Sequence, residues 1–185
     1  SWEHMTQAID NSLKALGTDH VDLYQLHTYQ PNWPLDRTME GLQRLRDSGK
    51  IRYVGVSNFS AEQTVDALKF GPVHSSQPRY NMLFRDVEES VLPSCLENGI
   101  GVLPYEPLAK GLLTGRYRPG HEFPSEDHRS SSGWFQGESF QRVFEVTERL
   151  SRWAADHGRD LVQLAVSWTL ARPAVTSSIV GARSP

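Results

Sequence analysis

The chain has 185 residues, a hydrophobic fraction of 38%, a charged fraction of 22% and a net charge of −3 at pH 7. This length and composition allow one sizeable buried core, which excludes an intrinsically disordered protein. Charges of both signs are interspersed, so the sequence lacks the basic stripe that binds nucleic acid or an anionic membrane surface. We therefore expect one domain over residues 1–185 and a small-molecule ligand.

Cysteine usage and hydropathy bear on the cellular compartment. The only cysteine, Cys95, cannot form an internal disulfide and is expected to be a buried packing residue. The sequence shows no signal peptide and no apolar run of membrane-spanning length. These features predict a cytoplasmic protein.

The first half of the chain alternates helices with short apolar runs. Apolar residues at helical spacing predict a helix that ends at Gly17, and the run VDLYQLH predicts a strand. A helix over residues 34–48 and the strand IRYVGVSNF follow, after which Ser60 is expected to cap a helix that Gly71-Pro72 ends. The pattern is that of strand–helix units.

The second half continues this alternation around one long loop. The segment HSSQPRYN, a helix in VEESVLPSCLENG and the strand IGVLPYEPL come first. Residues 108–137 are rich in Gly, Pro and Ser, and such a long connection is expected to be a functional loop. Helices over residues 139–157 and 161–171 then lead to a last strand, TSSIVGA.

Five strands separated by helices predict an α/β fold with a parallel sheet. A full barrel of eight β/α units needs ~250 residues, so this chain is expected to form an incomplete (β/α)8 barrel of about five units. In such barrels the ligand-binding residues lie where the strands end, on the carboxyl side. The predicted strand ends here carry His27, Ser57-Asn58, Gln77, Tyr105 and Gly181.

Each of these residues has a functional and a structural interpretation. The His27 imidazole can donate a hydrogen bond to a substrate carbonyl, or it can be a satisfied structural histidine. Asn58 and Gln77 have the donors and acceptors that recognise a carboxamide such as that of nicotinamide, and Ser57 adds a hydroxyl; all three can also simply cap an element. Tyr105 can stack on a flat heterocycle or belong to the core.

The segment LAKGLLTG has exposed backbone amides that suit a pyrophosphate, although a plain turn is the commoner role of such glycines. The sequence contains no G-x-G-x-x-G after a strand, no P-loop, no G-x-S-x-G and no His/Glu pair at metal-binding spacing. No metal site is predicted.

Several collinear strings resemble the aldo-keto reductases, in the bacterial branch related to potassium-channel β-subunits. The strings are SLKALGTDHVDLYQLH, GKIRYVGVSNFS, QPRYNML, GIGVLPYEPLAKGLLTG and SSIVGARSP. The resemblance covers nearly the whole chain. It implies a (β/α)8 barrel that binds NADPH and reduces aldehydes or ketones to alcohols, with hydride from the cofactor and a proton from a tyrosine.

The resemblance also implies individual roles. His27 matches the histidine that orients the substrate carbonyl, and Tyr105 matches the aromatic residue that stacks on the nicotinamide. The carboxamide-binding set matches Ser57, Asn58 and Gln77. The pyrophosphate loop matches Leu108, Gly111 and Leu113, and the adenosine-phosphate segment matches Gly181 and Arg183, where Arg183 is expected to pair with a 2′-phosphate.

Two features depart from the family pattern. The catalytic Asp, Tyr and Lys of the family lie in β/α units that precede those matched here, and the last helix of the family is also absent. Glu106 stands where the family usually has Ser or Thr, which places a carboxylate near the expected pyrophosphate unless Lys110 offsets it.

These departures lead to three functional expectations. The first is part of an NADPH-dependent reductase of small carbonyl substrates that has no activity as an isolated chain. The alternative is a non-catalytic cofactor-binding or regulatory module. A third expectation is self-association through the open edge of the barrel, because exposed sheet edges rarely remain unpaired.

Overall fold

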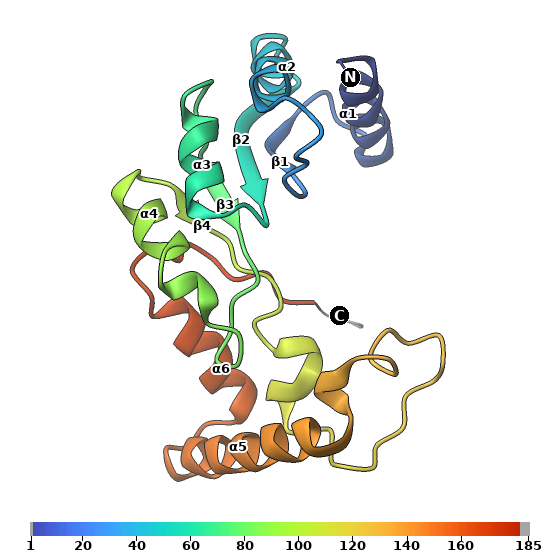
Figure 1. Ribbon diagram of the computed structural model, residues 1–185, viewed down its shortest axis with the longest axis vertical. Coiled ribbons are helices and arrows are strands. Elements are labelled where there is room, and N and C mark those ends of the chain that lie inside the picture. The colour runs from blue at the N-terminus through green and yellow to red at the C-terminus, as the bar shows by residue number, and fades with distance from the viewer. Residues whose placement is uncertain (1, 182–185) are drawn as a thin grey trace. The chain divides into compact units, whose positions relative to one another are not determined.

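A computed structural model describes residues 2–181, and its contacts divide the chain into two compact units (Figure 1). Unit 1 comprises Ser1–Pro78, Asp86–Pro104 and Pro173–Ser177, and unit 2 comprises Arg79–Arg85, Tyr105–Arg172 and Ser178–Pro185. The expectation of a single domain stays a prediction.

Unit 1 is built on a parallel sheet in the order β1-β2-β3-β4, which is also the chain order. Its strands are β1 (Val21–Leu26), β2 (Ile51–Ser57), β3 (Ser75–Gln77) and β4 (Gly101–Val102). Its helices are α1 (Trp2–Leu16), α2 (Leu35–Asp47), α3 (Ala61–Leu68), the 3-10 turn η1 (Asp86–Glu88) and α4 (Val91–Glu97). The predicted parallel α/β fold is confirmed.

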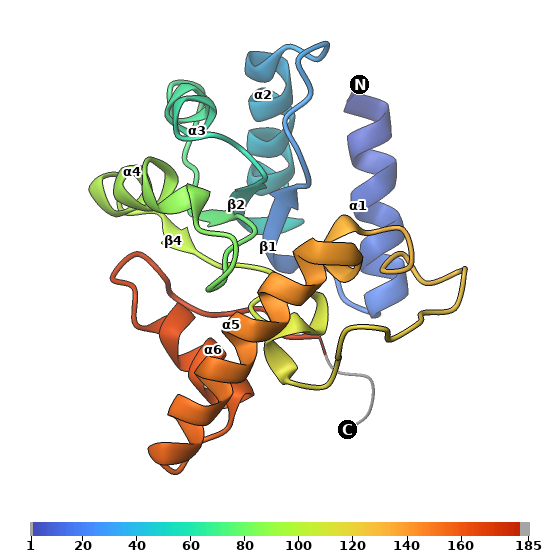
Figure 2. The same ribbon diagram turned by 60° about the horizontal axis from the view of Figure 1, so that its bottom comes forward.

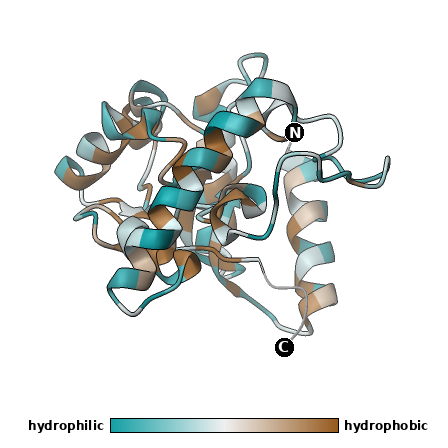
Figure 3. Ribbon diagram, turned by 90° about the horizontal axis from the view of Figure 1, so that it is seen from below, coloured by the Kyte–Doolittle hydropathy of each residue, from teal (hydrophilic) through white to brown (hydrophobic). Residues whose placement is uncertain are grey.

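The helices of unit 1 follow one another in the same order as the strands. α1 contacts α2, α2 contacts α3 and α3 contacts α4, so the four helices form an arc around the sheet (Figure 2). Alternating apolar and polar bands along the helices in Figure 3 correspond to the amphipathic spacing in the sequence. Ile9, Leu42 and Val56 have no exposed surface, and burying each such side chain contributes roughly 1.5–3 kcal/mol.

Several element boundaries agree with the sequence. The backbone of Gly17 is left-handed (φ +67°) directly after α1 ends, a conformation that is strained for most residues that carry a Cβ. Ser60 caps α3: its Oγ accepts a hydrogen bond from the Gln63 amide at 3.1 Å, and the Gln63 side chain accepts one from the Ser60 amide at 2.9 Å. Cys95 is 1% exposed, as expected for a packing residue.

Two predicted strands were too long. β4 contains only Gly101 and Val102, because Pro104 has no amide with which to continue a ladder. The last predicted strand, TSSIVGA, forms only one isolated parallel bridge, Ile179 with Tyr105 in unit 2, and Val175 just before it forms another with Val102 in unit 1. The described residues therefore contain four strands instead of five.

Unit 2 is mainly helical and irregular. It contains the 3-10 segments η2 (Ala109–Thr114) and η3 (Gly133–Phe135), followed by α5 (Gly137–Asp156) and α6 (Leu161–Leu170). Its core consists of buried aliphatic and aromatic residues from all four elements: Ala109, Leu112, Leu113, Phe135, Phe140, Val143 and Ala165. The predicted long loop thus contributes to a packed core.

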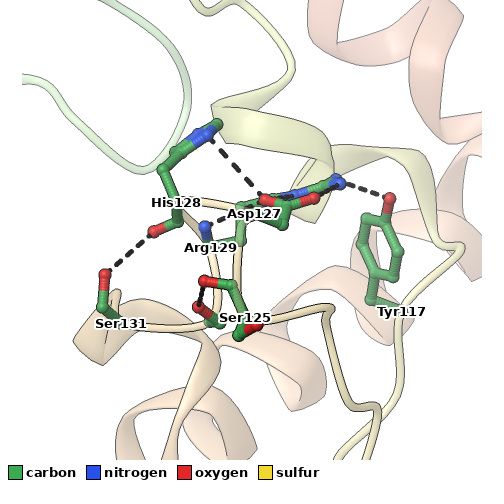
Figure 4. A network of polar contacts seen from close by, with 7 residues as sticks. Tyr117, Ser125, Asp127, His128, Arg129 and Ser131 are labelled. Atoms are coloured by element: carbon green, nitrogen blue, oxygen red, sulfur yellow. Dashed lines mark hydrogen bonds and ion pairs between the residues drawn. The ribbon is translucent and has the colours of Figure 1, made fainter.

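A polar network inside the 116–137 segment fixes its course (Figure 4). Arg129 is 8% exposed and donates hydrogen bonds to the Asp127 carboxylate, at 2.9 Å from Nε, and to the Tyr117 hydroxyl at 2.7 Å. Its guanidinium also lies 4.5 Å from the centre of the Phe123 ring. The hydrogen bonds from Arg129 hold the pKa of the Asp127 carboxyl well below its usual range.

No helix among residues 2–181 combines the length and the apolar character that crossing a bilayer requires.

Candidate active site

The carboxyl ends of β1, β2 and β3 bring three of the predicted site segments together in unit 1. The register pairs Leu26 with Val56 and Ser57 with Gln77, so His27, Asn58 and Gln77 follow or end neighbouring strands at one edge of the sheet. Parallel strands all end at the same edge, which is why residues far apart in the sequence meet here.

Hydrogen bonds join these residues into a continuous row. The Ser57 hydroxyl is buried and donates to the Gln77 carbonyl at 2.8 Å, and the Asn58 amide N–H donates to the same oxygen at 3.2 Å. The Asn58 Nδ2 group donates to the His27 carbonyl at 3.0 Å and to Ser57 Oγ at 3.1 Å. The backbone of Asn58 is left-handed (φ 57°), a conformation that asparagine tolerates better than most residues.

Gln25 belongs to this row, although the sequence analysis did not select it. Gln77 Nε2 donates to Gln25 Oε1 at 2.6 Å, and Gln25 Nε2 donates to Ser75 Oγ at 3.0 Å. Gln25 precedes His27 by two residues, and alternation along a strand places such residues on one face. The spacing of two residues was the signal in the sequence, because it predicts that the Gln25 amide lies on the same face as His27.

His27 is exposed at the end of β1 and lines a cavity of about 660 Å³. The cavity walls come from β1, α1, α2, the segment after β1 and the residue Phe59 after β2, and they include five aromatic side chains: Trp2, Tyr24, Tyr29, Trp33 and Phe59. Burial raises the pKa of the Tyr24 hydroxyl above its ordinary value. An accessible imidazole beside apolar walls can donate a hydrogen bond to a carbonyl oxygen.

Tyr105 lies in unit 2, where it pairs in parallel with Arg79 on one side and Ile179 on the other. Its backbone carbonyl accepts a hydrogen bond from the Tyr80 amide at 3.3 Å. The ring is partly buried, and this burial raises the pKa of the hydroxyl; Arg79 opposes that rise, and Glu106 adds to it. The Tyr105 ring therefore lies within the electrostatic influence of one cation and one carboxylate.

The predicted pyrophosphate loop is the kinked segment η2. Leu113 is fully buried and Leu108 packs against the same core, so these two positions offer a ligand backbone groups and not side chains. Gly111 has a φ of +98°, and a Cβ there would lie 2.8 Å from the Tyr117 ring. The Thr114 hydroxyl donates a hydrogen bond to the Gly111 carbonyl at 2.7 Å, so this hydroxyl is already engaged within the loop.

Comparison with known proteins identifies the family. The model of the aldo/keto reductase family matches residues 1–185, the full length of the chain. The chain belongs to the aldo/keto reductase family.

Curated relatives of this aldo/keto reductase chain are bacterial and yeast proteins. It is 40% identical over 182 residues to aldo-keto reductase YhdN of Bacillus subtilis (strain 168), covering 98% of the chain and 55% of the relative. It is 33% identical over 173 residues to aldo-keto reductase yakc [NADP(+)] of Schizosaccharomyces pombe, covering 92% and 51%. It is 35% identical over 192 residues to L-glyceraldehyde 3-phosphate reductase of Escherichia coli (strain K12), covering 98% and 55%.

A solved structure shows the same fold. The glycerol dehydrogenase AKR11B4 from Gluconobacter oxydans superposes with a TM-score of 0.94 at 33% identity, over 100% of this chain and 56% of that one. The predicted incomplete (β/α)8 barrel is thereby confirmed. The chain spans about half the length of the relatives it matches. A link to the potassium-channel β-subunit branch stays a prediction, because these relatives do not include a channel subunit.

The remaining predicted positions lie in or near unit 2 of this aldo/keto reductase. Glu106 has a left-handed backbone (φ 56°), and its carbonyl accepts a hydrogen bond from Asn81 Nδ2 at 2.8 Å. Its Oε2 atom is buried and has no hydrogen-bond partner among residues 2–181. Gly181 is exposed, and a Cβ at this position would have no neighbouring atom within 4 Å. Arg183 lies outside the described residues.

Proposed function

We propose that this chain forms the nicotinamide-binding part of an NADPH-dependent reductase that converts aldehydes or ketones to alcohols. The observation that carries the proposal is the hydrogen-bonded row from His27 through Asn58 and Ser57 to Gln77, at the sheet edge where β/α barrels bind ligands. The family match and the NADP(+) in the name of the Schizosaccharomyces pombe relative support it.

The side chains in the row fit a primary carboxamide. Such a group needs both donors and acceptors, and Asn58, Gln77 and Ser57 offer both kinds of atom. The 2.6 Å hydrogen bond from Gln77 Nε2 to Gln25 fixes the orientation of the Gln77 amide. A row held in this way loses little side-chain entropy when a ligand binds.

In this proposal His27 positions the substrate, and Tyr105 packs against the nicotinamide ring. The bound cofactor supplies the hydride. The exposed His27 imidazole donates a hydrogen bond to the carbonyl oxygen and so polarises the carbon that accepts the hydride. Leu108, Gly111 and Leu113 contribute backbone groups beside the pyrophosphate, and Gly181 and Arg183 contact the adenosine phosphate, where Arg183 favours NADPH over NADH.

Titration of the purified chain with NADPH, followed by cofactor fluorescence, tests this assignment. We expect saturable binding that Asn58→Asp weakens by about tenfold, because the substitution removes two N–H donors and adds a negative charge. Asn98→Asp is the matched control, since the Asn98 amide also donates to a backbone carbonyl, at 2.8 Å on the exposed end of α4. Failure of the wild-type chain to bind NADPH, or equal losses in both variants, contradicts the proposal.

Turnover and mass are measured on the same sample. We expect no reductase activity with an aldehyde, because the family tyrosine that donates the proton has no counterpart in the match. Loss of such a proton donor lowers the reaction rate by a factor of ~10²–10⁴. Oxidation of NADPH by the wild-type chain that is lost in His27→Ala would contradict this expectation. Light scattering gives the mass of the chain in solution and so tests self-association. The expected contact is through β1, which pairs with only one strand in the described sheet.

A further inference from the structure

Arg79 places a positive charge directly beside Tyr105 in unit 2. The two residues form a parallel bridge, and directly paired residues of neighbouring strands project their side chains to the same face. Burial raises the pKa of the Tyr105 hydroxyl and Arg79 opposes this rise, which agrees with side chains on the same face. Neither the sequence motifs nor the family resemblance assigned a role to Arg79.

The guanidinium of Arg79 is held by an aromatic ring. It lies 3.9 Å from the centre of the Phe84 ring, and Trp134 packs edge-on against the same ring at 4.7 Å. Phe84 is fixed in turn by its amide, which donates to the Oδ1 atom of the fully buried Asn81 at 3.1 Å. Stacking on a fixed ring orients the plane of the guanidinium.

This arrangement leaves the hydrogen-bonding edge of Arg79 available. The residue is exposed, and among residues 2–181 it forms no ion pair, with Glu106 or with any other carboxylate. Arg129 differs, because its N–H groups are committed to Asp127 and Tyr117. A stacked guanidinium with free N–H groups is suited to a bidentate contact with a carboxylate or phosphate.

We propose that Arg79 binds the carboxylate or phosphate of the carbonyl substrate, so that the site selects aldehydes or ketones that carry an anionic group. This proposal rests on the proposed function, in which Tyr105 packs against the nicotinamide and the reacting carbonyl lies beside that ring. The phosphates of the cofactor are the other source of such an anion, but the assignments above place them at Leu108–Leu113 and at Arg183.

The test compares two probes of similar size that differ in charge, 4-carboxybenzaldehyde and its neutral methyl ester. Ligand-observed NMR titrations of the 185-residue chain, with and without NADPH, give the affinity for each probe. We expect about tenfold preference for the carboxylate, lost in Arg79→Gln and reduced in Arg79→Lys, which keeps the charge without the planar fork. Arg118→Gln is the control: Arg118 is also exposed and lies 5.5 Å from the centre of the Phe144 ring.

The outcomes separate the two proposals. A wild-type chain that does not bind NADPH, but prefers the carboxylate and loses this preference in Arg79→Gln, contradicts the proposed cofactor site and supports the assignment of Arg79. Equal affinities for the two probes in the wild-type chain, or a preference that survives Arg79→Gln, overturn the assignment. Loss of NADPH affinity in Arg79→Gln with an unchanged preference for the carboxylate assigns the anion to the cofactor and also overturns it.

Discussion

The two units position their predicted site residues in different ways. In unit 1, regular parallel register aligns His27, Asn58 and Gln77, and hydrogen bonds between them complete the arrangement. In unit 2, the backbone around Tyr105 and Gly111 is irregular, with left-handed residues at Glu106, Ala109 and Lys110, and an aromatic core holds it in place. Pairing geometry therefore sets one group of residues, and side-chain packing sets the other.

Gly55→Ala tests the role of close pairing in unit 1 and is expected to have the largest effect. A Cβ at this position would lie 2.2 Å from Ser75 Oγ and 2.8 Å from Gln25 Cγ, so β2 and its polar neighbours must move. We expect a loss of about 1–3 kcal/mol in the free energy of unfolding together with loss of NADPH binding. Urea denaturation and NADPH titration measure the two effects.

Gly133→Ala provides the control for that variant, since nothing lies within 4 Å of a Cβ there and the backbone is not left-handed. We expect its unfolding curve and NADPH affinity to match those of the wild type. Full NADPH affinity in Gly55→Ala would show that the row does not depend on the tight contact between β2 and Gln25.

Gly111→Ala tests the packing argument in unit 2. The substitution strains a backbone at φ +98° and places a methyl group 2.8 Å from the Tyr117 ring. We expect a loss of about 1–2 kcal/mol in the free energy of unfolding, from the left-handed conformation and from the displaced ring. Gly49→Ala has a similar strained backbone (φ +78°) without a neighbour within 4 Å, so the difference between the two variants in urea denaturation measures the packing part.

The Asp127–Arg129 pair predicts how unit 2 responds to acid. Because Arg129 lowers the pKa of Asp127, the ionised carboxylate contributes stability above the ordinary aspartate pKa of about 3.9, and this contribution is lost as the pH falls through the lower value of the folded state. We expect hydrogen exchange in the 116–137 segment, corrected for intrinsic rates, to accelerate below about pH 4. In Asp127→Asn, exchange should be faster at neutral pH and should lose this acid dependence.

Gln25→Leu is expected to have the smallest effect and isolates the contribution of the residue that the sequence analysis missed. The variant keeps a similar side-chain volume but removes the 2.6 Å hydrogen bond from Gln77 and the 3.0 Å hydrogen bond to Ser75 Oγ. Only the hydrogen bond from Gln77 orients a residue of the proposed cofactor site, so we expect NADPH affinity to fall by about three- to tenfold, the range for loss of one neutral hydrogen bond. An unchanged affinity would show that Gln77 keeps its orientation without Gln25.

The sequence by itself determined the alternation of helices and parallel strands, the cap at Ser60 and the stop at Gly17, because each depends on local periodicity or on the conformational range of one residue. It also located His27, Ser57, Asn58 and Gln77 at strand ends, since the carboxyl side of a parallel sheet follows from chain direction. The role of Gln25, the short β4 and the setting of Arg79 against Phe84 and Tyr105 were decided by tertiary structure alone. They depend on register and packing between segments distant in the sequence, and no local pattern encodes those contacts.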